Sequence, residues 1–240
     1  MMNKQRAWII WGLVMLSMLA ACRADTPTEI PPEEIVMNSV TRMREVQGFQ
    51  FIVLRSVESA FLDEAKTLSF RRAEGSYLQP DHVSATIRVV APGLVADIDL
   101  ISMGDRQWQT NLLTRAWESV PPENSFNPAD LFDPESGIPA ALELDLSGLE
   151  LIESVEIEEL PGQVFYTLRG QLDGGRAFEM SFGLIGPGTL DISLWIAPET
   201  FELYRMIVVE PGMDGEDDTT WQIDFWDFDQ VGEIEEPILE

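Results

Sequence analysis

The stretch "ATIRVVAPGLVADIDL", Ala85–Leu100, decides the fold that this sequence predicts. Apolar and polar residues alternate on both sides of Pro92-Gly93, which is typical of two strands joined by a tight turn. A Pro-Gly pair favours a type II turn. If Ala91 lies opposite Leu94, the two strands pair residue by residue along their length. We therefore expect an antiparallel hairpin here.

In this register one face of the hairpin is polar and the other is apolar. Arg88 lies opposite Asp97, and Thr86 lies opposite Asp99. The apolar side chains that share the other face are Ala85, Ile87, Val89, Ala96, Ile98 and Leu100, with Leu94 next to the turn. This pattern is expected of an antiparallel sheet that is solvated on one side and covered on the other.

Period-two alternation starts at Phe49 and returns through much of the chain. We expect strands at 106–113, 116–122, 162–172, 176–185, 189–198, 201–210 and 219–228. The apolar positions that alternate in two of them are Phe178, Met180, Phe182 and Leu184, and then Leu190, Ile192, Leu194 and Ile196. Gly174-Gly175 and residues 186–188 are interpreted as turns. The sequence thus predicts about ten antiparallel strands.

A few helices accompany these strands. Glu33–Gln47 has apolar residues at helical spacing, with prolines before it and Gly48 after it. Between the two groups of strands, residues 124–144 contain Asn127-Pro128 and Asp133-Pro134, each typical of a cap followed by proline in a first helical turn. The predicted fold class is mainly β with a few helices. Periodicity alone leaves open a closed or half-open barrel and a two-sheet sandwich.

The amino terminus has the three regions of a secretory signal. Lys4 and Arg6 precede the uncharged, mostly apolar run 7–21, which ends in small residues. This run is shorter than the ~20 residues that a membrane-spanning helix needs. "LAAC", Leu19–Cys22, resembles the lipobox of bacterial lipoproteins, in which the cysteine thiol receives a diacylglyceryl group. The alternative is an ordinary signal peptide with a cysteine nearby by chance.

We therefore divide the chain into three parts. Residues 1–21 are the expected lipoprotein signal peptide, residues 22–32 the lipidated Cys22 with a proline-rich tether, and residues 33–240 the folded domain. Two or three acyl chains on one cysteine hold a protein stably at a membrane, whereas one chain does so only marginally.

Charge excludes some partners. Residues 1–21 contain two of the 15 basic residues and none of the 42 acidic ones, which leaves a formal charge of −29 for the rest of the chain. Such a polyanion is repelled by nucleic acid and gains nothing from an anionic membrane surface, so the lipid must provide the attachment. A single cysteine also excludes an intramolecular disulfide.

No catalytic or metal-binding motif stands out in the sequence. There is no Gly-x-Ser-x-Gly elbow and no glycine-rich phosphate loop, and the only histidine, His82, is expected at a strand rim. An envelope hydrolase is disfavoured because no nucleophile and base can be paired. "MDGEDDTT", residues 213–220, has oxygen ligands for calcium but not the spacing of a known loop, which favours a solvated turn. We expect no enzymatic activity, no cofactor and no metal.

The chain resembles the LppX/LprAFG family of bacterial envelope lipoproteins. The resemblance rests on the lipobox, on the helix leading into a strand at Gly48-Phe49, on the central block Asp81–Pro122 and on "FNPADLFDP", Phe126–Pro134. It implies a curved antiparallel half-barrel with helices over its concave face, similar in fold to the Lol lipoprotein carriers, that encloses an apolar cavity for acyl lipids or glycolipids. The strong acidity of this chain departs from the family.

The resemblance gives the apolar face a function. The residues expected to line the lipid cavity are Ile87, Val89, Leu94, Ala96, Ile98, Leu100, Phe182, Leu184, Ile192 and Leu194. The expected protein is anchored to the outer side of the cytoplasmic membrane and carries or presents lipids within the envelope. The alternative is a non-catalytic interaction or sensor lipoprotein with a packed core and no lipid ligand.

Overall fold

The expected hairpin is present in the computed structural model, which describes residues 30–56, 67–121, 126–152, 155–212 and 217–239. Strand β3 (His82–Ala91) pairs antiparallel with β4 (Leu94–Met103), and Ala91 lies opposite Leu94 as predicted. The φ angle of Gly93 is +79°, which a type II turn requires at this position. The register inferred from the sequence is therefore confirmed.

The polar face of the hairpin carries the expected cross-strand pairs. Arg88 Nε lies 2.8 Å from Asp97 Oδ1, and Thr86 Oγ1 donates a hydrogen bond to Asp99 Oδ1 over 2.9 Å. The hydrogen bond from Arg88 lowers the pKa of the Asp97 carboxyl. On the opposite face Ala85, Val89 and Leu100 are buried, so the hairpin is solvated on one side and covered on the other, as expected.

All the strands in the described ranges belong to one antiparallel sheet. The remaining strands are β1 (Gly48–Arg55), β2 (Ser69–Leu78), β5 (Arg106–Thr110), β6 (Trp117–Val120), β7 (Leu146–Ile152), β8 (Tyr166–Asp173), β9 (Thr189–Ile196), β10 (Leu203–Glu210) and β11 (Thr219–Trp226). Their spatial order is β6-β5-β4-β3-β2-β1-β11-β10-β9-β8-β7, and every neighbouring pair is antiparallel. Over the part of the chain that the structure describes, the sheet has eleven strands.

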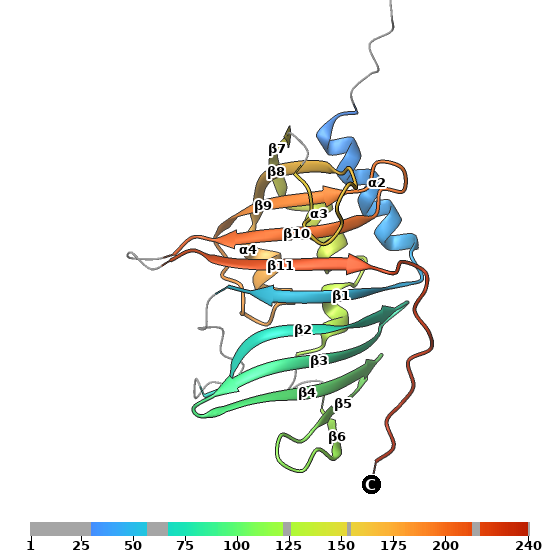
Figure 1. Cartoon of the computed structure of the whole chain (residues 1–240), viewed down its shortest axis with the longest axis vertical. Coiled ribbons are helices and arrows are strands. Elements are labelled where there is room, and N and C mark those ends of the chain that lie inside the picture. Colours follow the sequence, from blue (N-terminus) through green and yellow to red (C-terminus); the bar gives the residue numbers. More distant parts are fainter. Residues whose placement is uncertain (1–29, 57–66, 122–125, 153–154, 213–216, 240) are drawn as a thin grey trace, which may run out of the picture. The chain divides into compact units, whose positions relative to one another are not determined.

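The order of the strands explains the half-barrel. The first six strands form one meander, the last five form a second, and β1 pairs with β11 where the two meet. The outermost strands β6 and β7 do not pair with each other, so the sheet is not closed. Figure 1 shows the sheet curving around helices on one side. The predicted fold class, a curved antiparallel half-barrel with helices over its concave face, is confirmed.

The first helix, α2 (Pro32–Glu45), agrees with the prediction of Glu33–Gln47 to within two residues. Its buried side chains are Ile35, Val36, Ser39, Val40 and Met43, which form the expected apolar stripe. Arg42 joins this helix to the connection between β9 and β10 through an ion pair with Glu202 at 2.7 Å, and to the segment after β11 through an ion pair with Asp229 at 2.6 Å.

The chain between the two meanders forms a short 3-10 helix, η3 (Pro128–Leu131), and helix α3 (Ile138–Leu144). Asn127 caps η3 as predicted, because its side chain accepts from the Ala129 N–H. The prediction of a helix beginning at Asp133-Pro134 was wrong. Asp133 instead accepts N–H groups from the next turn, so that the chain bends before α3 begins.

The strand predicted at 176–185 was also wrong, because this segment contains helix α4 (Gly174–Met180). Strand β8 pairs directly with β9 as far as Asp173 opposite Thr189, so the intervening residues leave the sheet. The Asp173 side chain caps the helix by accepting the Gly175 N–H over 2.9 Å. Gly174-Gly175 therefore begins a helix and does not form the predicted hairpin turn.

Two strands have sequence patterns that are too weak to predict them individually. Strand β2 carries charged residues and Gly75 in its middle, which interrupt the alternation. Strand β7 has a register shift between Ser147 and Glu150, and Gly148 adopts a φ of +61° there. A bulge adds a residue to one strand and so disturbs the period of two.

Aromatic side chains of the concave face pack around Phe132, the residue that directly follows η3. The Phe132 ring lies 5.1 Å from Phe49, 4.8 Å from Phe51, 5.2 Å from Tyr77 and 6.4 Å from Phe225. Burial raises the pKa of Tyr77 to about 12, and its hydroxyl donates to the carbonyl oxygen of residue 80. This aromatic cluster fills the part of the core that lies beside an apolar cavity.

Candidate functional site

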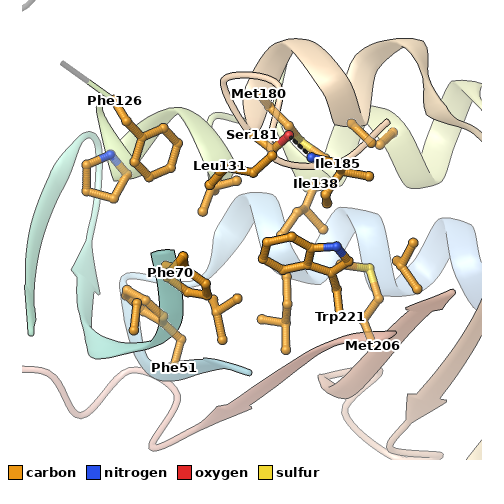
Figure 2. A pocket seen from close by; sticks show the side chains of 18 of the residues that line it. Phe51, Phe70, Phe126, Leu131, Ile138, Met180, Ser181, Ile185, Met206 and Trp221 are labelled. Atoms are coloured by element: carbon orange, nitrogen blue, oxygen red, sulfur yellow. Dashed lines mark hydrogen bonds between the residues drawn. The ribbon is translucent and has the colours of Figure 1, made fainter. Parts of the chain in front are cut away.

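An apolar cavity lies between the concave face of the sheet and the helices. Its volume is about 90 Å³. The strand side includes Phe51, Phe70, Met206 and Trp221, and the helix side includes Ile138 of α3, as Figure 2 shows. We call this space the inner cavity.

Small side chains keep the inner cavity open. Ala73 and Ala85 contribute to its strand side, and Ala141 and Ala177 contribute to its helix side. Ala85, Ala141 and Ala177 are buried, whereas Ala73 is half-buried. Larger side chains here would fill the space, because protein interiors otherwise pack as densely as organic crystals.

None of the described residues that line the inner cavity is charged. The one hydroxyl among these residues, that of Ser181, accepts the Ile185 N–H over 3.0 Å and donates to the Phe178 carbonyl over 3.4 Å. The chain itself thus satisfies this group. A site of this kind favours hydrocarbon and excludes ions, since an unpaired charge is costly to bury.

A larger groove adjoins the inner cavity. Its volume is about 560 Å³, and it shares Ile87, Phe126 and Leu184 with the inner cavity. We call it the outer groove. Its walls combine apolar residues with polar ones, which are the amides of Gln107, Gln109 and Asn111, the hydroxyl of Thr110 and the carboxylate of Glu118. Two of its apolar side chains are largely in solvent: Leu113 is 87% exposed and Phe182 is 69% exposed. Exposed apolar side chains that are grouped at a groove indicate a surface that binds an apolar partner or ligand.

The predicted cavity residues fall into three groups. Those that line the inner cavity or the outer groove are Ile87, Ile98, Leu100, Phe182 and Leu184. Those that are buried without lining either space are Val89, Ile192 and Leu194. Those near the tip of the β3–β4 hairpin are Leu94, which is 45% exposed, and Ala96, which is half-buried. Cys22 lies outside the described residues.

The structure adds lining residues that the sequence did not single out. On the strand side these include Val53, Met206, Trp221 and Ile223, which alternate in their strands as the hairpin residues do. The period of two in the sequence identifies these residues as one face of a strand, but it does not indicate which strands border an open space. For the lining residues of α3 and α4, the sequence contains no pattern that points to a cavity.

Charged groups lie around the inner cavity and not within its wall. The Arg55 guanidinium carbon lies 5.0 Å from the centre of the Trp221 ring. Burial lowers the pKa of Arg55, and the nearby Glu210 carboxylate partly offsets this effect. Arg205 and Asp224 form a two-pronged ion pair at 2.6 and 2.7 Å on the opposite face of the sheet.

The described residues contain no cluster of three or more metal-ligating side chains. His82 is at the start of β3, and its Nε2 lies 3.7 Å from Asp81 Oδ1. The acidic stretch 213–216 lies outside the described residues. In the described ranges, no helix has the length and apolar character required to span a membrane.

Comparisons with known proteins place this geometry in a family. The family model described as LppX_LprAFG lipoprotein matches residues 31–232. The crystal structure of LprF from Mycobacterium bovis is similar with a TM-score of 0.64 and 17% identity, covering 86% of this chain and 96% of that one. The crystal structure of Mycobacterium tuberculosis lipoprotein LppX gives a TM-score of 0.58 and 11% identity, covering 85% and 98%.

A more distant similarity is that to a LolA superfamily protein from Nitrosomonas europaea. Its TM-score is 0.29 with 12% identity, and the match covers 86% of this chain and 96% of that one. A search of curated proteins found no match.

Proposed function

Since the chain belongs to the LppX_LprAFG lipoprotein family, we propose that it binds acylated lipids or glycolipids and carries or presents them within the cell envelope. The observation that supports this most is the uncharged inner cavity that adjoins the outer groove. At about 560 Å³, the groove has the size typical of ligand sites, ~300–1,000 Å³.

The inner cavity is smaller than that range. It accepts a short apolar segment, so a full acyl chain extends into the outer groove or separates α3 and α4 from the sheet. The energetics permit exchange with a bilayer. A chain of sixteen methylenes gains about 13 kcal/mol on leaving water, and it gains a similar amount in a membrane. Transfer between the two is therefore near balance.

The small inner volume also favours a second candidate, a non-catalytic interaction or sensor module without a lipid. The test is to produce the chain from residue 23 onward in bacteria, which retains the compact unit Pro32–Glu240. Organic extraction and mass spectrometry then identify any lipid that copurifies. Stoichiometric acyl lipid supports the carrier. No lipid, together with no binding of a fluorescent acyl probe, supports the interaction module.

The anchor is proposed at Cys22, with processing between residues 21 and 22 and attachment to the outer side of the cytoplasmic membrane. Cys22→Ser removes the thiol that would carry the diacylglyceryl group. The variant should leave the detergent phase for the aqueous phase, or remain unprocessed, when fractions are compared by immunoblot. Continued cleavage and detergent partitioning of the variant would rule out this anchor.

A further inference from the structure

We propose that the outer groove binds the headgroup of the lipid, and that it selects an uncharged headgroup rich in hydroxyl groups, such as a sugar, over a phosphate. This inference rests on the proposed lipid-binding function and specifies the class of lipid that the site accepts. It starts from the polar groups along the walls of the two spaces.

The inner cavity and the outer groove differ in polarity. The accessible wall of the inner cavity is wholly apolar, whereas part of the accessible wall of the outer groove is polar. The residues that border both spaces, Ile87, Phe126 and Leu184, are apolar, and the described polar residues of the groove come from β5, β6 and the connection between them. An amphiphile that occupies both spaces therefore places its hydrocarbon in the inner cavity and its polar end beside β5 and β6.

Strand pairing brings three of these polar side chains to one face of the sheet. Gln107 and Gln109 are two residues apart in β5, so they lie on the same face. Gln109 lies opposite Leu100 of β4 on one side and opposite Glu118 of β6 on the other. Leu100 also lines the outer groove, so this is the face of the sheet that borders it.

These polar groups can be reached by a ligand. Gln109 is half-buried and Glu118 is exposed. The side-chain amides of Gln107 and Gln109 form no hydrogen bond with a residue in the described ranges, and neither amide is cut off from solvent. The Glu118 carboxylate accepts one hydrogen bond, from Asn111 Nδ2 over 2.9 Å. A carboxylate has room for several more, so Glu118 keeps acceptor capacity.

The described lining of the outer groove carries no positive charge, since it contains no arginine, lysine or histidine. The arginines next to it along the chain are engaged elsewhere, because Arg106 pairs with Glu236 and Arg115 pairs with Asp99. The chain as a whole has a formal charge of −27. A phosphate in the groove would meet a carboxylate and the negative potential of the protein, without the cation that normally binds it.

Hydroxyl groups suit the same wall. A hydroxyl both donates and accepts, which matches the amides of Gln107 and Gln109, and it can donate to the Glu118 carboxylate, which only accepts. Such a bond to a charged acceptor is stronger than one between neutral groups. An ionised phosphodiester has no proton to donate. The wall beside β5 and β6 therefore favours the headgroup of an uncharged glycolipid.

The test compares two lipids with the same two acyl chains, a glucosyl diacylglycerol and phosphatidylmethanol, whose phosphodiester headgroup has no hydroxyl. Each is dispersed in the same nonionic detergent, and affinity is measured by displacement of a fluorescent acyl probe from the chain beginning at residue 23. The parent chain should prefer the glucosyl lipid. In Gln109→Leu, which removes the amide, the affinity for the glucosyl lipid should fall about two- to twelvefold, the range of one neutral hydrogen bond. Gln171→Leu, the same change at an exposed position of β8, is the matched control and should have no effect.

A second variant tests the charge of the groove. Glu118→Gln removes the negative charge and keeps an oxygen acceptor. Its affinity for phosphatidylmethanol should rise about 1.5- to 5-fold, the range for exposed charges. Glu150→Gln removes one charge from β7, at the opposite edge of the sheet, and should leave this affinity unchanged. An equal rise in both variants would reflect net charge alone and would overturn the assignment to the groove.

A third measurement needs no variant. Salt screens charge, since the Debye length falls from ~30 Å at 0.01 M to ~3 Å at 1 M, so the preference of the parent chain for the glucosyl lipid should decrease as salt rises. Phosphatidylmethanol bound as tightly as the glucosyl lipid, or a preference that neither salt nor Gln109→Leu changes, overturns the inference while leaving lipid binding intact. Failure of the probe and of both lipids to bind the parent chain instead overturns the proposed function.

Discussion

Replacing Ala73 with phenylalanine should lower the affinity for a fluorescent acyl lipid at least tenfold and leave the fold intact. Ala73 is half-buried on the strand side of the inner cavity, which has a volume of about 90 Å³. A phenyl ring placed there occupies the space that an acyl chain would enter. Filling an existing cavity commonly stabilises a protein by ~0.5–2 kcal/mol, so the free energy of unfolding should stay the same or rise.

Ala96→Phe is the matched control for this experiment. Ala96 is also an alanine on the apolar side of the sheet, but it lines neither the inner cavity nor the outer groove. Its substitution should leave the affinity within about twofold of the parent. Binding and chemical denaturation are measured for both variants.

The same pair of variants separates the two candidate functions. In a solidly packed interior, Ala73→Phe would overfill the core and cost ~1–3 kcal/mol of stability. A destabilised Ala73→Phe together with no lipid binding in the parent chain would support the interaction module. Equal loss of binding in Ala73→Phe and Ala96→Phe would place the lipid elsewhere on the sheet.

Phe132→Ala should cost about 3–5 kcal/mol of unfolding free energy, the largest loss that we expect from a single truncation in the core. Phe132 is 4% exposed and packs against the aromatic cluster of the concave face. Removing its ring loses apolar burial and leaves a void that rigid aromatic neighbours fill poorly. Urea denaturation measures the change as a lower midpoint with an unchanged slope.

Phe182→Ala is the control for this truncation, since it removes the same ring from a side chain that is 69% exposed. Its unfolding free energy should change by less than about 0.5 kcal/mol. A loss in Phe182→Ala comparable to that in Phe132→Ala would mean that Phe182 packs into the core and does not form the rim of the outer groove.

The β3–β4 hairpin was predictable from its own residues, because a turn flanked by alternating side chains specifies both register and face. The same local reasoning located α2, η3 and most strands of the second meander. Of the proposed cavity residues, Ile87, Ile98 and Leu100 follow directly from the hairpin pattern, and they do lie along the inner cavity or the outer groove.

Alternation alone failed at residues 176–185. Phe178, Met180 and Phe182 alternate there as they would in a strand, yet Phe178 and Phe182 are exposed and Met180 belongs to α4. The pairing of β8 with β9 decides this segment, since it leaves no place in the sheet for the residues between them. The local pattern of residues 176–185 cannot show that β9 already occupies the edge of β8 with which this segment would otherwise pair.

The amino-acid sequence by itself determined the period, the turns, the register of the central hairpin and the family resemblance, because these depend on neighbours along the chain. Only the tertiary structure decided that Ala73 and Ala85 on the sheet and Ala141 and Ala177 on the helices border one open space. A cavity is the volume left over when segments distant in sequence pack together, so no single segment contains the information that defines it.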